Sequence, residues 1–310
     1  MGRIGSARRW AGAVGPAAAS LWAEAKNAVL VNISGHLSPS PLFDAFRRRV
    51  MVDIDPGFTQ FWHADGLPGA RVAGHDMHFT IGERIGHPDC PIPTNGIEWR
   101  FVRPPVVLDD WPVAPSAPAG SIRFTTVGSW RGAFGPVEHG GRTYGVKAHE
   151  FRRFVTLPTL APERFEIALD IHPADASDRD ALERNGWAIV DPRKVASTPD
   201  RFRDYVRASA AEFSVAQGVY VDTASGWFSD RTTRYLASGR PALVQDTGFS
   251  ESLPVGERLV AFTPLADAVR GAQDIAARYP EHAAAARRVA ERHFDARRVL
   301  EAFWDEVAGG

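Results

Sequence analysis

The sequence of 310 residues contains a single cysteine, Cys90. An internal disulfide is therefore impossible, and no zinc site can be built from cysteine thiolates. The low cysteine content favours a reducing compartment, and we expect the protein in the cytoplasm. The chain also has no run of about 18 apolar residues, so we expect no membrane span.

An excess of charge of one sign is also missing. The 36 lysines and arginines balance 37 aspartates and glutamates, which gives a net charge of -1. We therefore expect no nucleic-acid partner. No G-x-G-x-x-G follows a predicted strand, which argues against a dinucleotide dehydrogenase. The basic and alanine-rich start is broken by Gly15 and Pro16, so we do not expect a signal peptide.

Three neighbouring residues, His75, Asp76 and His78, are of the types that bind metals. Their spacing does not follow a zinc pattern, and a loop followed by a strand accounts for them better. We predict no metal site and no bound cofactor.

Short apolar runs followed by polar or glycine residues predict buried strands of parallel sheets. In the first part of the chain such strands are predicted at 28–33, 50–54 and 78–81, with a short one near 106–107. Further strands are predicted at 122–127, 165–171, 187–190, 219–221, 241–245 and 259–262. Helical segments are predicted between and after them, at 147–157, 178–185, 205–210, 264–278 and 280–307.

Strands that alternate with helices of this length form βαβ units, so the predicted fold class is α/β. The stretch 111–120 is rich in proline and alanine and is the best candidate for a linker. We therefore predict two Rossmann-like domains, over residues 1–113 and 121–280. The remaining residues, 281–310, form a C-terminal helix that packs back on the first domain or closes its own.

A polar turn at the start of a predicted helix carries the first sign of function. The sequence around it reads SGWFSDRTTRYLASGRP from Ser225 onward. Free N–H groups and the helix dipole make such a terminus an anion site, and Arg231 adds a charge suited to phosphate. The plainer interpretation makes Trp227 and Phe228 core residues, Asp230 a helix cap and Arg231 a solvated charge.

Two basic residues favour the phosphate interpretation. Arg131 follows the first strand of the second predicted domain, and Lys147 begins or precedes the next helix. Open α/β sheets bind ligands at the carboxyl ends of their strands, so both side chains are expected near the turn at Gly226. Taken singly, each is explained equally well as a surface charge. Thr247-Gly248 ends another strand at the same edge, although a glycine there is more often a simple turn.

These motifs resemble the nucleotide-sugar-binding domain of GT-B glycosyltransferases, in particular their retaining, glycogen-synthase-like branch. The resemblance covers roughly residues 120 to 300. It rests on Ser225-Gly226-Trp227-Phe228, on Leu236-Ala237-Ser238-Gly239-Arg240-Pro241 and on Gln245-Asp246-Thr247-Gly248. The family implies two Rossmann-like domains that face a cleft, with a basic pair that holds the donor diphosphate. Residues expected at that diphosphate are Arg131, Lys147, Ser225, Gly226, Trp227, Phe228, Ser229, Asp230 and Arg231.

The chain departs from this family in two respects. The two glutamates that the branch carries fall near Gly226 and Arg234, and neither is acidic. Asp230 or Glu212 is expected to replace one of them, and Glu212, Thr247 and Gly248 are predicted at the donor sugar or base. The first domain lacks the usual glycine-rich first strand, so we expect it to be incomplete.

The acceptor side is expected on the first domain. Asp55, at the end of a predicted strand, is the first candidate for a catalytic residue that orients or deprotonates the acceptor hydroxyl, and His36 is the second. Each is equally well explained as a turn residue or helix cap. Gln60, Phe61 and Trp62 are candidates for an acceptor pocket, although buried aromatic residues are commoner.

The resemblance implies a metal-independent glycosyltransferase that moves a sugar from a nucleotide-diphosphate-sugar donor to an unknown acceptor (a glycan, a lipid or a small molecule). A sugar-nucleotide hydrolase or epimerase on the same fold is the next alternative. A third is a degenerate, non-catalytic GT-B domain that binds nucleotide or a partner protein.

Overall fold

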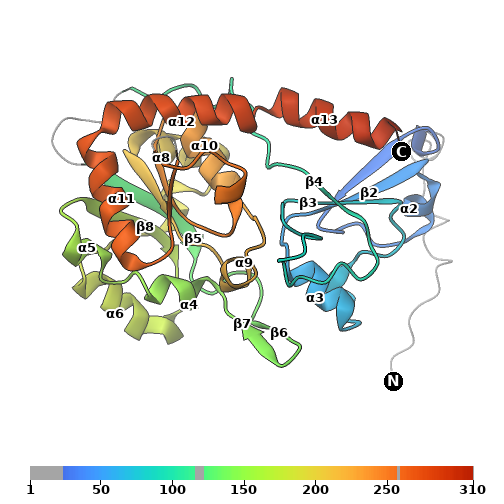
Figure 1. Ribbon diagram of the computed structural model, residues 1–310, viewed down its shortest axis with the longest axis horizontal. Helices are drawn as coiled ribbons and strands as arrows, with labels where there is room; N and C mark the ends of the chain where they lie inside the picture. The colour runs from blue at the N-terminus through green and yellow to red at the C-terminus, as the bar shows by residue number, and fades with distance from the viewer. Residues whose placement is uncertain (1–23, 116–121, 257–258, 310) are drawn as a thin grey trace.

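A computed structural model describes residues 24–115, 122–256 and 259–309 (Figure 1). Parts of the predicted first domain (1–23) and linker (116–121) thus lie outside the described residues. The first part of the chain forms a four-stranded parallel sheet in the order β1-β2-β3-β4. Its strands are β1 (Val29–Ile33), β2 (Arg48–Asp53), β3 (Met77–Thr80) and β4 (Trp99–Phe101).

The second part forms a six-stranded sheet in the order β12-β11-β10-β5-β8-β9, with every neighbouring pair parallel. Counted along the chain this is 6-5-4-1-2-3, the doubly wound order. The order reverses between β5 and β10, so a crevice opens at their carboxyl ends. The strands are β5 (Arg123–Ser129), β8 (Arg164–Asp170), β9 (Ala188–Val190), β10 (Ala211–Ser214), β11 (Ala242–Gln245) and β12 (Val260–Phe262).

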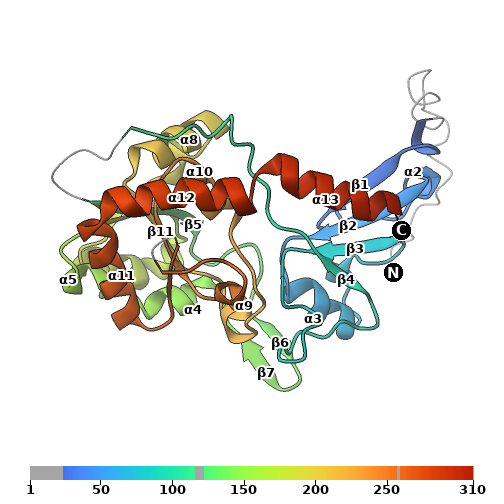
Figure 2. The ribbon, with the colours of Figure 1, turned by 45° about the horizontal axis from the view of Figure 1, so that its top comes forward.

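Helices cover both sheets, as the parallel arrangement requires. In the first part they are α2 (Pro41–Ala45) and α3 (Phe58–Ala64). In the second part they are α4 (Lys147–Arg152), α5 (Leu157–Leu160), α6 (Ala176–Arg184), α7 (Pro192–Val195), α8 (Pro199–Ala208), α9 (Gly218–Asp222), α10 (Asp230–Ala237) and α11 (Leu265–Ala277). A small antiparallel hairpin, β6 (Val137–His139) with β7 (Arg142–Tyr144), extends from the second part toward α3 (Figures 1 and 2).

The C-terminal segment is two helices, α12 (Tyr279–His293) and α13 (Ala296–Gly309). Figures 1 and 2 show α12 on the second sheet and α13 running over to the first sheet. Phe303 and Val307 of α13 pack in one cluster with the sheet residues Val50 and Phe79. The last helix therefore joins the two parts of the molecule.

The chain crosses between the two parts earlier than the proline-rich stretch suggested. It leaves the first sheet after β4, and the amide of Val106 already donates to the carbonyl of Phe294 at 2.8 Å. Ala296 in turn donates to the carbonyl of Val106 at 2.9 Å. The segment that leaves the first sheet is therefore hydrogen-bonded to the junction of α12 with α13.

A shared apolar core fixes the two sheets relative to each other. Phe58 and Phe61 of α3 belong to one buried cluster with Tyr144 of β7 and Tyr220 of α9. The Phe61 and Tyr144 rings stack with centroids 4.9 Å apart. Phe61 is therefore a core residue that joins the domains, in agreement with the plainer interpretation of the Gln60–Trp62 stretch.

One predicted strand, 219–221, is wrong: these residues lie in α9. The β-branched run suggested a strand, but tertiary contacts decide otherwise. A Cβ on Gly218 would lie only 2.7 Å from the carbonyl oxygen of Gly145, so the backbones touch there. Burial of Val219 and Tyr220 in the shared core then favours a single helical turn.

Candidate functional site

A cavity of about 560 Å³ lies between the two sheets, at the crevice of the doubly wound sheet. Its second-domain wall is mainly polar and its first-domain wall mainly apolar. The second-domain wall consists of Lys147, Gln217, Tyr220, Trp227, Ser229, Asp230, Arg231 and Arg234. The opposite wall is formed by Val31, Ile33, Val52, Ile54, Asp55, Ile81, Val102, Arg103, Pro104 and Pro105, and α13 adds Leu300 and Phe303.

Lys147, the first residue of α4, places its ammonium group at the end of β5. A Cβ on Gly128 would lie 3.6 Å from Nζ, so the glycine leaves room for the lysine. Burial, together with the nearby positive charge of Arg231, lowers the pKa of Lys147 to about 7. A bound anion would favour the charged form of this ammonium group and raise its pKa again.

Arg231, in the first turn of α10, is fixed by three hydrogen bonds that cross the ends of β5 and β10. Nε donates to Oε1 of Glu212 at 2.7 Å, Nη1 to the carbonyl of Val127 at 2.9 Å, and Nη2 to Oγ of Ser214 at 2.9 Å. A guanidinium has five N–H donors, so two remain for a ligand. The buried carboxylate of Glu212 thus holds Arg231 rather than reaching a sugar or base itself.

The amino end of α10 opens into the same cavity. Ser229 caps the helix by accepting a hydrogen bond from the amide of Arg231 at 3.2 Å. Asp230 is exposed and pairs with Arg234 one turn later, at 2.5 Å. The cap satisfies only one of the free amides, and the dipole of α10 adds to the positive potential of Lys147 and Arg231.

Asp55 faces these cations from the first domain. Its Oδ1 accepts a hydrogen bond from the hydroxyl of Tyr220 at 3.2 Å, across the cavity. Tyr220 also stacks on Trp227, with ring centroids 4.6 Å apart. Burial and the neighbouring charge of Asp53 raise the pKa of Asp55, while the hydrogen bond from Tyr220 opposes that rise. The raised pKa suits a carboxylate that accepts a proton.

Asp53, at the end of β2, accepts hydrogen bonds from Asp55 and from three neighbouring side chains. Its carboxylate accepts from Thr59 Oγ1 at 2.7 Å, Gln60 Nε2 at 2.9 Å and Thr80 Oγ1 at 2.9 Å. It also accepts from the amide of Asp55 at 3.1 Å. Gln60 is thus part of this buried network and not an open acceptor contact.

Four of the nine residues predicted at the diphosphate do not line the cavity, namely Arg131, Ser225, Gly226 and Phe228. Arg131 points outward with a side chain that is 60% exposed, and it forms a two-point ion pair with Asp175 at 2.7 and 2.8 Å. The buried Trp130 before it takes the inward position instead. Phe228 is core, as the plainer interpretation had it, and stacks on Phe294 with centroids 5.0 Å apart.

The turn at Gly226 and the turn at Gly248 are covered by the first domain. The amide of Arg84 donates to the carbonyl of Ser225 at 3.0 Å, and a Cβ on Gly226 would lie 3.0 Å from that amide nitrogen. A Cβ on Gly248, where φ is +97°, would lie 2.7 Å from Cδ of Arg84. The side chain of Thr247 donates inward, to the carbonyl of Trp227 at 2.5 Å. The loop after β3 therefore occupies the surface where the sequence predicted the donor sugar.

His36 does not line the cavity. Its side chain is exposed and its Nδ1 lies 3.2 Å from Nη1 of Arg71. The histidines after β2 are structural: Nδ1 of His75 and Nε2 of His78 both lie 3.1 Å from the carbonyl oxygen of Val72. Within the described ranges, no group of three or more histidine, cysteine, aspartate or glutamate side chains is placed to hold a metal ion.

Sequence reasoning missed the residues that complete the polar wall. Gln217 accepts a hydrogen bond from the amide of Lys147 at 2.5 Å and so links α9 to α4. Tyr220 was predicted to lie in a strand, and Arg234 was considered only because it stands where the resembling family has a glutamate. A polar residue at the end of β10 would have been the signal for Gln217, but β10 itself was not predicted.

Comparisons with known proteins support the fold. No family model matches the sequence, and no curated protein sequence matches it. Among solved structures, an alpha-glucosyltransferase in complex with UDP-glucose and DNA containing an abasic site has a TM-score of 0.61 at 10% identity, over 96% of this chain and 84% of that chain. Anabaena Alr3699/HepE in complex with UDP has a TM-score of 0.58 at 10% identity, over 96% and 84%.

A third match, TarM, has a TM-score of 0.47 at 10% identity, and this chain spans only 54% of that protein. The predicted resemblance to GT-B glycosyltransferases is confirmed at the level of the fold, an α/β architecture with two parallel sheets. Many of the structural neighbours are glycosyltransferases, some of them in complex with UDP or UDP-glucose. None of the helices in the described part of the chain has the length and apolarity that crossing a bilayer requires.

Proposed function

We propose that the protein is a glycosyltransferase that moves a sugar from a nucleotide-diphosphate-sugar donor to an acceptor hydroxyl. The observation that carries the proposal is the meeting of Lys147, Arg231 and the amino end of α10 in one cavity, at the crevice of a doubly wound sheet. This crevice is where such sheets bind nucleotides. The structural neighbours solved with UDP or UDP-glucose agree with this choice of donor.

In this proposal the diphosphate is the leaving group. Two cations and a helix dipole fixed in advance would neutralise the charge that develops on it. We infer that this replaces a metal ion, so that transfer is metal-independent and needs no bound cofactor. Asp55, which faces the cations from the other wall, would receive the proton of the acceptor hydroxyl. A cytoplasmic location, where nucleotide sugars are made, fits the single cysteine.

The experiment is a thermal-shift screen of the full-length protein with UDP, GDP, ADP, TDP and CDP, with and without Mg²⁺, followed by assays of nucleotide release from the matching sugar donors. The proposal expects one diphosphate to raise the Tm without metal and its sugar donor to be turned over. Lys147→Met should abolish the Tm shift, and Lys194→Met, an exposed lysine on α7, serves as the matched control. If no nucleotide shifts the Tm, the proposal fails.

One observation favours a second candidate, a nucleotide-binding protein without catalysis. The loop after β3 covers Gly226 and Gly248, and neither position of the two family glutamates is acidic. This candidate expects the same nucleotide to bind without release from any sugar donor. Turnover that depends on Asp55 would exclude it.

A further inference from the structure

The cavity between the two sheets has two chemically different walls. The second-domain wall carries Lys147, Arg231 and Arg234. On the first-domain wall, only Asp55 and Arg103 among the lining residues have charged or polar side chains. Nη2 of Arg103 donates to Oε1 of Glu83 at 3.0 Å, and Oδ1 of Asp55 accepts from the hydroxyl of Tyr220 at 3.2 Å. Asp55 and Arg103 are thus the polar groups of an otherwise aliphatic first-domain wall.

Several of these aliphatic side chains are exposed to the cavity. Ile33 is 53% exposed and is the last residue of β1, where it pairs with Val52 of β2. Ile54 is 41% exposed and comes one residue after the end of β2. Because the ends of β1 and β2 lie side by side in a parallel sheet, the two isoleucines form a continuous apolar surface next to Asp55. Apolar surface of this kind gains free energy when a ligand removes it from water.

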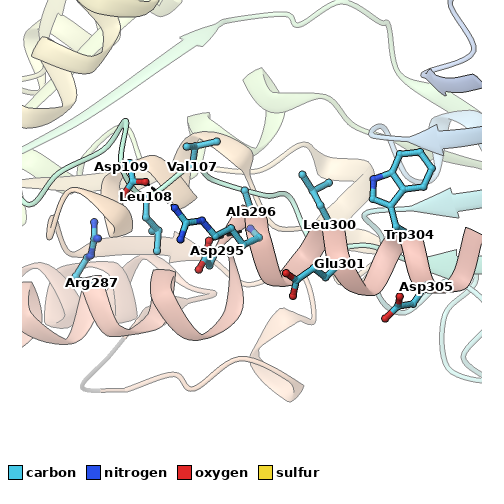
Figure 3. Close-up of a pocket in the computed structure, with 11 residues that line it drawn as sticks. Val107, Leu108, Asp109, Arg287, Asp295, Ala296, Leu300, Glu301, Trp304 and Asp305 are labelled. Carbon is cyan, nitrogen blue, oxygen red and sulfur yellow. Dashed lines mark hydrogen bonds and ion pairs between the residues drawn. The ribbon is translucent and has the colours of Figure 1, made fainter.

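Helix α13 continues the apolar surface. Leu300 is 43% exposed and borders both the interdomain cavity and a second groove of about 740 Å³ along the helix. Figure 3 shows Leu300 and Trp304 on one side of α13, with the acidic Glu301 and Asp305 on the other. The residues of α13 that line the interdomain cavity are Leu300 and Phe303, and both are apolar.

Such a wall does not suit a glycan acceptor. A sugar acceptor brings several hydroxyl groups, and each one that enters an aliphatic pocket without a partner loses its hydrogen bonds to water. On the first-domain wall, only Asp55 and Arg103 among the lining residues can pair with hydroxyl groups. The wall fits a molecule with one reacting hydroxyl on an apolar body.

Resting on the proposed glycosyltransferase function, we propose that the acceptor is a hydrophobic alcohol or phenol. Its apolar body lies against Ile33, Ile54 and Leu300, and its hydroxyl meets Asp55. The acceptor oxygen forms a bond to the anomeric carbon while the bond from that carbon to the diphosphate oxygen breaks. The nucleoside diphosphate leaves with the bonding electron pair, and the hydroxyl proton passes to Asp55. No oxidant or reductant is needed.

The test uses full-length protein and the sugar donor found in the nucleotide screen. Four acceptors are compared: 4-methylumbelliferone, 1-octanol, methyl glucoside and glycerol. Products are detected by mass, and nucleotide release is measured at varied acceptor concentration. The first two acceptors distinguish an aromatic from an alkyl body. We expect one or both to be glycosylated, with KM at least about tenfold below that of the two hydrophilic compounds.

The matched variants are Ile33→Asn/Ile54→Asn and Leu160→Asn. Leu160 is 52% exposed on α5, away from the cavity lining, and serves as the control. In the double variant we expect the KM for the apolar acceptor to rise by about tenfold or more, with the Kd for the nucleotide unchanged. The control should change neither quantity.

Two outcomes would overturn the inference. The first is preferred use of the hydrophilic acceptors, and the second is an unchanged KM in the double variant. In both the nucleotide still binds, whereas failure of the proposed function means that no nucleotide binds at all.

Discussion

Replacing Lys147 should change how nucleotide binding depends on pH. In the free protein, burial and the charge of Arg231 lower the pKa of Lys147 to about 7. A bound diphosphate favours the charged form and raises this pKa again. Above pH 7 the ligand must therefore be accompanied by a proton, and Kd should rise by about tenfold per pH unit. At pH 8, binding should take up about 0.9 proton per ligand.

The assay is isothermal titration calorimetry between pH 7 and 9, in pairs of buffers with different ionisation enthalpies. The terminal phosphate, with a second pKa of about 6, is still partly protonated at pH 7, and the comparison of wild type with Lys147→Arg at each pH separates its titration from that of Lys147. Lys147→Arg keeps the charge at every pH, so binding should persist and the proton uptake should disappear. Lys147→Met should abolish binding at every pH. A wild-type Kd that does not vary with pH, or an uptake that survives in Lys147→Arg, would refute the reasoning.

Three other predictions follow from close contacts. Gly248→Ala should lower the free energy of unfolding in urea by roughly 1–3 kcal/mol more than Gly256→Ala does. The reason is that a Cβ at Gly248 would lie 2.7 Å from a neighbouring side chain, whereas a Cβ at Gly256 would meet nothing within 4 Å. Equal losses in the two variants would contradict this. Asp53→Ala should lower the Tm and cost at least about 3 kcal/mol, since three buried side-chain donors lose their acceptor; a Tm equal to wild type would count against the network. Tyr220→Phe removes the hydrogen bond that lowers the pKa of Asp55, so the acid limb of the rate profile should move to higher pH, and a shift to lower pH would be inconsistent with it.

The strands that were predicted well are those that can be recognised from their own residues alone. The runs that became β1, β2, β5 and β11 are short, apolar and followed by polar or glycine residues. β10 was missed because its residues, Ala211–Ser214, include a glutamate and a serine. Both are buried at the crevice, where Glu212 pairs with Arg231 in the first turn of α10. A buried ion pair of this kind has no signature in a periodic pattern.

The candidate site was predicted in part. Lys147, Ser229, Arg231, Trp227 and Asp55 all line the cavity, since their positions follow from the ends of elements that were placed correctly. Contacts between the domains could not be read from the sequence. The ion pair of Arg131 with Asp175 and the packing of the loop after β3 on Gly226 both depend on how distant segments meet.

The most direct test of the account is a calorimetric titration of the best-binding nucleoside diphosphate into four proteins: wild type, Arg131→Ala, Arg231→Met and Lys147→Met. Circular dichroism first establishes that Arg231→Met is folded, because it leaves the buried Glu212 unpaired. The account predicts equal affinity for wild type and Arg131→Ala, and loss of binding in both Arg231→Met and Lys147→Met. Loss of binding in Arg131→Ala, with affinity retained in the other two, would contradict it.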